Sequence, residues 1–201
     1  MIFISSPASG AESSSAKAEP IRTLPGKAVR VPLTRQSSNY TCGAAALQSI
    51  FGFYGDEYRE DVLARLLKSG PRHGTNYHRI ERLARSKGYE VRSYENLTVK
   101  RLKEFLDDGK PVICLIQAWS ETPCDYSDDW QDGHYVVAIG YDTTDFFFMD
   151  PSTLGNYTYI PEKEFLARWH DTDGKEVLVN FGMVISKSKS GFDTLEVKKI
   201  E

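Results

Sequence analysis

The sequence is poor in cysteine, with three among its 201 residues. An odd and small number of cysteines argues against a disulfide framework. Cys114 falls in an apolar run typical of a buried strand, and Cys124 falls in a polar loop. A bridge between these two is one interpretation, and the simpler one is three free thiols in a reducing compartment.

Other features are missing as well, and each absence argues against a class of function. No apolar stretch approaches the roughly 18 residues of a membrane-spanning helix, so we predict no integral membrane segment. The net charge is -3 and no basic run is interleaved with aromatics, which argues against a nucleic-acid partner. The sequence lacks CxxC and HExxH spacings and a phosphate-binding glycine loop, so it predicts no metal and no cofactor.

What is present fits a single globular domain, because 40% of the residues are hydrophobic. We expect this domain at residues 26–185, followed by a peripheral charged tail at 186–201. Residues 1–25 include a Ser-, Ala- and Gly-rich stretch that predicts a disordered tail, although the run at 15–18 also resembles a small-residue cleavage site. The chain is therefore expected to be cytoplasmic, or exported if residues 1–25 are the remnant of an export signal.

Periodicity and capping residues predict helices at 42–55, 58–68, 75–87, 99–109 and 161–169. Strands are predicted at 89–94, 111–117, 135–141, 146–149, 157–160 and 177–185, after a short strand or extended entry at 27–34. The helices come mainly first and the strands second. This order indicates an α+β fold in which an N-terminal helical half packs on a C-terminal antiparallel sheet, with a cleft between the halves as the natural place for a site.

Cys42 opens the first predicted helix, within the segment QSSNYTCGAAALQSI. The thiolate is the nucleophilic form of cysteine, and a helix N-terminus stabilises negative charge through its dipole and free N–H groups. The opposite interpretation is a buried structural cysteine, which is the usual state of a free thiol. The downstream partners of Cys42 favour the chemical interpretation.

His134 and Asp150 are these partners. His134 begins an apolar strand, so its imidazole can project from the sheet edge, take a thiol proton and return one to a leaving group. Asp150 follows the next strand, and a hairpin with its turn near 142–145 makes the two residues neighbours across the strands. A carboxylate there fixes the ring tautomer and favours the imidazolium. For Asp150 an ordinary Asp-Pro turn is the alternative.

Four further residues complete the predicted site. Gln36 lies six residues before Cys42, and its side-chain amide is a donor for a developing oxyanion together with the Cys42 backbone N–H. We predict substrate contacts for Gly43, which removes a side chain where a substrate approaches, and for Gly133 and Trp130, which immediately precede the histidine.

An acidic loop leads into this histidine. We use that name for the segment that contains Asp125, Asp128, Asp129 and Asp132. It lacks the pattern of a calcium loop, so a solvated loop is the plain interpretation. A preference for basic substrates is the alternative hypothesis.

Four segments together resemble a known family. They are VPLTRQSSNYTCGAAAL from Val31, the triplet His73–Thr75, GHYVVAIGYD from Gly133, and FMDP around Asp150. In this order they are similar to the bacteriocin-processing, double-glycine-leader cysteine peptidases of the papain-like superfamily, over about residues 29–170. The resemblance implies a papain-like fold, with Cys42 as nucleophile, His134 as base and acid, Asp150 as its orienter and Gln36 in the oxyanion hole.

The sequence therefore predicts a cysteine peptidase that acts on a peptide or protein through an acyl-enzyme. Two alternatives stay open: an amidase or acyltransferase that uses the same acyl-enzyme, and a non-catalytic peptide-binding module on the same fold. Bacteriocin-processing members are fused to a transmembrane segment and an ATPase, which this sequence does not contain. Cleavage at a double glycine is therefore not carried over.

Overall fold

The computed structural model describes residues 22–122, 124–172 and 175–188, together with residues 197 and 199. Most of the predicted N-terminal tail or export signal, and most of the predicted C-terminal tail, lie outside these residues. Contacts with the domain begin before residue 26, because Arg22 pairs with Asp145 at 3.1 Å and Leu24 packs on the core. In the described part of the chain, no helix is long and apolar enough to span a membrane.

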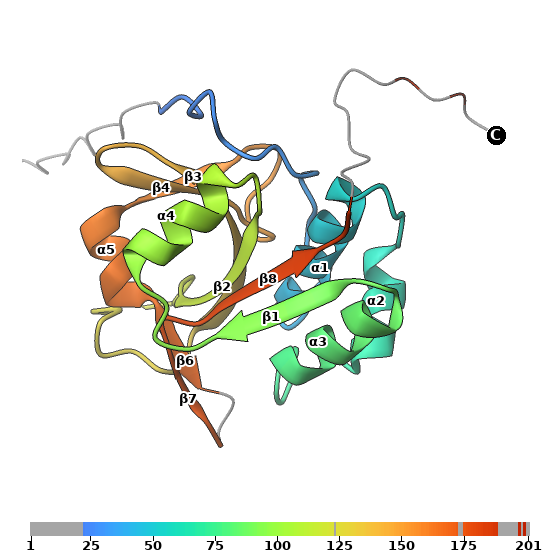
Figure 1. Ribbon diagram of the computed structural model, residues 1–201. Coiled ribbons are helices and arrows are strands. Elements are labelled where there is room, and N and C mark those ends of the chain that lie inside the picture. Colours follow the sequence, from blue (N-terminus) through green and yellow to red (C-terminus); the bar gives the residue numbers. More distant parts are fainter. Residues whose placement is uncertain (1–21, 123, 173–174, 189–196, 198, 200–201) are drawn as a thin grey trace, which may run out of the picture.

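A six-stranded antiparallel sheet forms the centre of the molecule, in the order β1-β8-β2-β3-β4-β5 (Figure 1). Its strands are β1 (Glu90–Tyr94), β2 (Val112–Gln117), β3 (Gly133–Tyr141), β4 (Asp145–Met149), β5 (Thr158–Pro161) and β8 (Gly182–Ser186). The last strand in the sequence thus lies between β1 and β2.

Helices cover both faces of this sheet. One face packs against α1 (Cys42–Phe53), α2 (Glu60–Leu67) and α3 (Tyr77–Ser86), and the other against α4 (Val99–Asp107) and α5 (Glu162–Arg168). The predicted fold class, with an N-terminal helical half packed on an antiparallel sheet, is confirmed. The two later helices were predicted as elements, and the structure adds that they bury the second face.

The residues of β2 show how this arrangement is encoded. Side chains alternate between the faces of a strand, so Ile113 and Leu115 join the core under α1 while Val112, Cys114 and Ile116 join the core under α4 and α5. Because both faces are covered, every residue of β2 is buried. The continuous apolar run is therefore typical of its central position.

The prediction of one strand at 177–185 was wrong. The chain forms β7 (Val177–Val179), which pairs with β6 (His170–Thr172) in a separate two-stranded sheet, and then β8. Asn180 separates β7 from β8 with a φ of 49°, a left-handed conformation that interrupts an extended strand. β6 was not predicted, since three residues carry too little alternation to mark a strand.

The segment at 27–34 has no regular strand pairing, although Val29 N–H donates to the Ile139 carbonyl at 2.7 Å. It is the extended entry that was the second interpretation. The entry leads to Thr41, which takes the N-cap position of α1 without a side-chain capping bond. Its hydroxyl instead accepts a hydrogen bond from the Ser38 N–H at 3.2 Å, which shapes the loop before the helix.

Candidate active site

Cys42 is the first residue of α1, and only 5% of its surface is exposed. The Thr41 carbonyl accepts hydrogen bonds from the Ala44 and Ala45 N–H groups, so the first helical turn is closed directly behind the cysteine. All three cysteines are free thiols, so the alternative of a bridge between Cys114 and Cys124 is wrong. Cys42 is thus placed where the predicted nucleophile requires it.

His134 lies at the start of β3, where the strand comes closest to the beginning of α1. Its Nε2 is 2.7 Å from Asp150 Oδ1, and its ring also shares a hydrogen bond with the Cys42 thiol. Since Asp150 occupies Nε2, Nδ1 is the nitrogen left for the thiol. The three predicted residues therefore form one connected chain of polar groups.

Asp150 is held from several sides. Besides His134, its Oδ1 accepts the Ser152 N–H at 2.8 Å, and its Oδ2 accepts the Thr153 hydroxyl at 3.1 Å. Burial raises the pKa of this carboxyl, but the hydrogen bond and charge of His134, with the bonds from Ser152 and Thr153, bring it below its ordinary value. Asp150 is an ionised, fixed partner for the imidazole.

The pKa values of the thiol and the imidazole move toward an ion pair. Burial raises the pKa of Cys42, but the hydrogen bond and charge of His134 and the backbone N–H groups of Tyr135 and Gly43 bring it below its usual value. Burial lowers the pKa of His134, whereas Asp150 and Cys42 raise it to about 9. Both shifts favour a thiolate beside an imidazolium.

Gln36 is tied to the loop that follows Asp150. Its backbone N–H donates to the Pro151 carbonyl at 3.1 Å, and its Oε1 accepts the Ser152 hydroxyl at 3.2 Å. Because Oε1 is engaged as an acceptor, the amide is oriented with Nε2 as its remaining end. The NH₂ group at that end is a hydrogen-bond donor, as a group that binds an oxyanion must be.

Two hollows flank the Cys42–His134 pair. The first, which we call the Cys42 cleft, has a volume of about 440 Å³ and is lined by Cys42, Trp130 and Gly133 among others. The second has a volume of about 350 Å³ and is lined by His134 and Trp119 among others. Each residue of the pair therefore borders a depression of the surface.

The predicted role of Gly43 needs a correction. A Cβ on this residue would lie 2.7 Å from the Thr75 Cβ and 3.1 Å from the ring of Tyr135. Thr75 and Tyr135 therefore already fill the space that was reserved for substrate. Gly43 permits the close approach of α1 to these two residues, and its backbone N–H serves the thiol.

Gly133 and Trp130, for which substrate contacts are predicted, line the Cys42 cleft beside a carboxylate that the sequence did not predict. A Cβ on Gly133 would lie 2.4 Å from Asp171 Oδ1, so the missing side chain leaves room for this carboxylate. Gln117 Nε2 donates to the same oxygen at 3.2 Å, and burial raises the pKa of Asp171 to about 6. Asp171 was missed because its strand, β6, was missed.

Two tryptophans offer apolar surface on the two sides of the site. Trp130 is 39% exposed and packs against His170 with ring centroids 4.4 Å apart. Trp119 is 58% exposed and has a φ of 67°, a left-handed conformation that is rare for a bulky residue. Strained backbone conformations cluster at functional sites, so this exposed aromatic residue beside His134 is a signal of a functional position that only the structure provides.

Among the described residues, one group has the donors of a cation site: Cys124, Asp129 and Asp132. It belongs to the acidic loop and not to the Cys42–His134–Asp150 chain. In that chain, His134 is the partner of both Cys42 and Asp150.

The model of the Peptidase_C39 like family matches residues 29–177. The chain belongs to this family. The match contains Cys42, His134 and Asp150 and confirms the resemblance to bacteriocin-processing peptidases. No curated protein sequence matches the chain.

Solved structures share the C39 fold with this chain. The peptidase domain of Streptococcus ComA, a bifunctional ABC transporter of a quorum-sensing pathway, is 21% identical with a TM-score of 0.60, over 79% of this chain and 98% of that domain. A double glycine motif protease from an AMS/PCAT transporter, solved with its leader peptide, is 20% identical with a TM-score of 0.57, over 83% and 98%. A protein described as a C39-like peptidase from Bacillus anthracis is 16% identical with a TM-score of 0.62, over 80% and 97%.

Proposed function

We propose that this C39-like protein is a cysteine peptidase that cleaves peptide bonds through a Cys42–His134–Asp150 triad. The observation that carries the proposal is the hydrogen-bonded chain from the thiol through His134 to Asp150, in which Nε2 and Oδ1 are 2.7 Å apart. The lowered thiol pKa and the raised imidazole pKa support it, because they describe a nucleophile that is ready before substrate arrives.

The reaction proceeds in two halves. The Cys42 thiolate attacks the peptide carbonyl carbon, and the carbonyl π electrons move to oxygen. The His134 imidazolium then gives its proton to the leaving amine as the C–N bond breaks, which leaves an acyl-enzyme. In the second half, neutral His134 takes a proton from water, the hydroxide adds to the thioester, and the acid leaves as the thiolate is restored.

The oxyanion of each tetrahedral intermediate needs hydrogen-bond donors. We assign this role to the Cys42 backbone N–H and the Gln36 side-chain amide, whose Oε1 is already engaged by Ser152. Asp150 keeps the ring of His134 in one orientation and stabilises its positive charge, so that the proton moves between the thiol and the leaving group.

The test compares the wild type with Cys42→Ala on a library of internally quenched peptides. We expect turnover by the wild type and none by Cys42→Ala, with unchanged circular dichroism. Cys114→Ala is the matched control, because it removes another buried thiol outside the site, and it should retain turnover. Cleavage by Cys42→Ala at the wild-type rate would refute the assignment.

The same assay separates the alternatives. Adding small primary amines to the reaction and analysing the products by mass spectrometry shows whether the acyl group goes to water or to an amine. A wild type that binds peptides, cleaves none and gains no adduct at Cys42 would be the non-catalytic binding module.

A further inference from the structure

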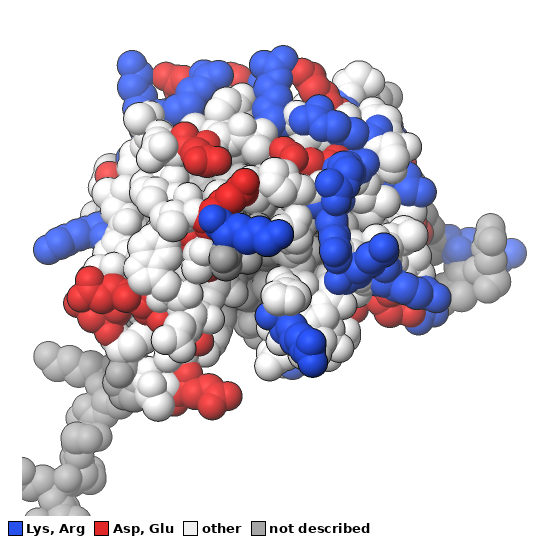
Figure 2. Space-filling view, turned by 90° about the horizontal axis from the view of Figure 1, so that it is seen from below, with Lys and Arg blue, Asp and Glu red and all other residues white. Residues whose placement is uncertain are grey.

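A third hollow, with a volume of about 730 Å³, adjoins the Cys42 cleft, and its lining is strongly cationic. We call it the basic hollow; its Lys and Arg residues are Lys68, Arg72, Arg79, Arg82 and Lys175. Of the described residues that line it, none is Asp or Glu. Figure 2 shows Lys and Arg gathered on the right of the view, the side on which α2 and α3 lie in Figure 1.

Most of this positive charge is not neutralised by acidic groups of the described residues. The Arg79 guanidinium donates to the carbonyls of Leu67 and Lys68, at 3.1 and 2.9 Å, and so caps the end of α2. The side chains of Lys68, Arg72 and Arg82, in contrast, are exposed and form no ion pair with any described residue. Unpaired like charges around one hollow repel each other, and an anion that enters relieves this repulsion.

The nearby acids Glu81 and Glu176 each lie 3.4 Å from a ring nitrogen of His78, which lines the basic hollow. Glu176 accepts the Tyr77 hydroxyl at 2.8 Å, and Glu81 accepts the Ser93 hydroxyl at 2.6 Å. Neither acid forms an ion pair with Lys68, Arg72 or Arg82, so these three cations stay available to an outside partner. The hollow is positive although the whole chain carries a net charge of -3, so its charge is a local feature and not the average of the surface.

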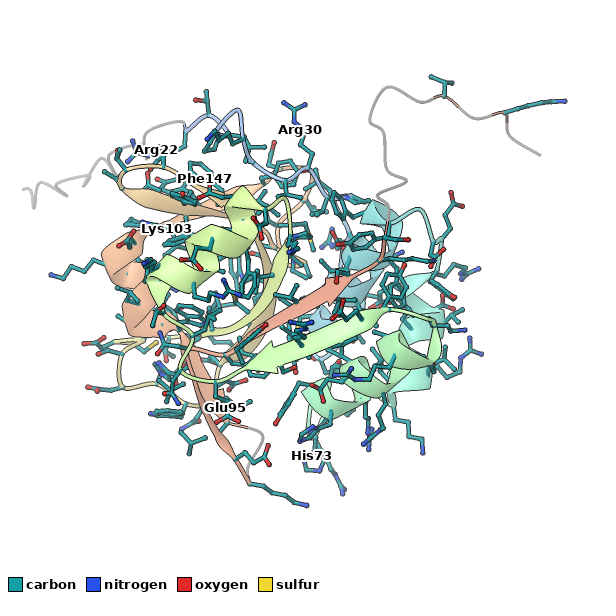
Figure 3. The ribbon with its side chains drawn as sticks, viewed as in Figure 1. Arg22, Arg30, His73, Glu95, Lys103 and Phe147 are labelled. Atoms are coloured by element: carbon teal, nitrogen blue, oxygen red, sulfur yellow. The ribbon has the colours of Figure 1, made fainter. Side chains whose placement is uncertain are left out.

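The basic hollow and the Cys42 cleft are neighbours that share one wall. Pro71, Arg72, His73, Gly74 and Asn76 line both. Figure 3 places His73 on the loop before α3, at the lower edge of the molecule, where this shared wall lies. A peptide that runs through the Cys42 cleft in this direction therefore passes directly over the cations.

We propose that the basic hollow binds an acidic segment of the peptide whose scissile bond lies at Cys42. This inference rests on the proposed peptidase function and names the class of its substrate. A peptide is the occupant because the hollow shares its wall with the cleft of the proposed nucleophile, where the scissile peptide is expected to lie. The acidic loop, which by itself suggested basic substrates, borders the Cys42 cleft at Trp130. The basic hollow lies on the other side of Pro71–Gly74, so the two charged regions contact different parts of a bound peptide.

The experiment scans charge along a cleavable peptide. A quenched peptide taken from the library carries a tract of three Glu, three Gln or three Lys residues. The tract is placed at distances of about three to eight residues from the scissile bond, on either side of it. This range is chosen because an extended chain advances ~3.3 Å per residue. We expect the Glu tract to lower KM by about 3- to 30-fold relative to the Gln tract at one set of positions, with little change in kcat. The Lys tract should raise KM at the same positions.

The variant Lys68→Gln/Arg82→Gln tests whether the hollow is responsible. It should cleave the Gln-tract peptide like the wild type and lose most of the preference for Glu, and adding Arg72→Gln should remove the remainder. Lys100→Gln/Lys163→Gln is the matched control, because it removes two exposed lysines of α4 and α5 and should keep the full preference. Raising NaCl from 0.05 to 1 M should abolish the preference in the wild type, because the screening length falls to about 3 Å at 1 M.

Binding to Cys42→Ala, followed by the fluorescence anisotropy of labelled peptides, keeps this test independent of turnover. If no peptide is cleaved but the Glu-tract peptide binds through Lys68 and Arg82, the peptidase proposal fails and the acidic-peptide proposal stands. Equal affinity for Glu and Gln tracts, a preference that survives in Lys68→Gln/Arg82→Gln, or tighter binding of a single-stranded RNA of equal charge would overturn the proposal.

Discussion

Cys42 and Cys114 are both buried free thiols, and they lie in the two cores on opposite faces of the same sheet. Their pKa values nevertheless move in opposite directions. Burial raises the pKa of Cys114 far above its usual range, while that of Cys42 falls below it. Burial is common to both residues, so it does not explain reactivity.

The difference lies in what surrounds each sulfur. Cys114 points from β2 into the apolar core under α4 and α5, where burial alone acts on it. Cys42 meets the ring of His134 and two backbone N–H groups. A low-polarity site destabilises an isolated charge, but it strengthens the attraction between two opposite charges. Burial therefore keeps Cys114 a thiol, whereas at Cys42 the interactions with His134 and the two backbone N–H groups outweigh it.

The largest expected effect is in alkylation by a small electrophile such as iodoacetamide. Only the thiolate reacts, and each unit of pKa difference changes its population tenfold. We expect Cys42 to react at least about 10³-fold faster than Cys114 at pH 7, as measured by site-resolved mass spectrometry. Equal alkylation rates at Cys42 and Cys114 would contradict the opposite pKa shifts of the two thiols.

His134→Ala should make Cys42 resemble Cys114. With the imidazolium removed, burial dominates and the pKa of the thiol rises, which is seen as a shift of the alkylation profile to higher pH. The loss of the general acid and base should lower kcat/KM by about 10²- to 10⁴-fold. Alkylation of the exposed Cys124 serves as the internal control and should not change. An unaltered Cys42 profile would mean that another group holds the thiolate.

Gln36→Ala should separate thiolate formation from catalysis. Removing one oxyanion donor lowers kcat by about 10²- to 10³-fold, whereas the alkylation profile of Cys42 should stay that of the wild type. Steady-state kinetics and alkylation on the same preparation give both quantities. A change confined to KM would show that Gln36 only contacts substrate.

Asp150→Asn should have the smallest effect of the four. A hydrogen bond to a charged partner contributes ~1.5–3 kcal/mol, which corresponds to a loss of about 10- to 100-fold in kcat/KM. The active ion pair exists above the lowered pKa of Cys42 and below the pKa of His134, which is about 9. Removing the carboxylate lowers the pKa of His134, so the alkaline limb of the rate profile should move to lower pH. A limb that stays near pH 9 would contradict the role of Asp150.

The central elements of the fold and the placement of the triad could be predicted from the sequence. Helix α1, strand β2 and the β3–β4 hairpin have strong periodicity or apolar runs. These elements contain Cys42 and His134, and Asp150 follows directly after β4. The segment after α5 could not be predicted, because β6 is too short to show a pattern and the left-handed Asn180 falls within an apparent strand.

The surroundings of the site were harder to predict than its centre. Asp171 approaches Gly133 from β6, which pairs with β7. The basic hollow joins Lys68 at the end of α2 to residues of α3 and to Lys175 before β7. Such contacts depend on tertiary packing. Gly43 shows the converse, since its position was correctly marked as special while the reason lay in Thr75 rather than in substrate.

The position of β8 also bears on how this protein is made. β8 pairs with β1 on one side and with β2 on the other, although it follows both far along the sequence. Until residues 182–186 have left the ribosome, β1 and β2 each present an open edge, and open strand edges invite pairing with other chains. Closing them needs contacts between distant parts of the chain, which form slowly. The central sheet of this protein is therefore completed last, and its nascent chain is exposed to aggregation until that strand inserts.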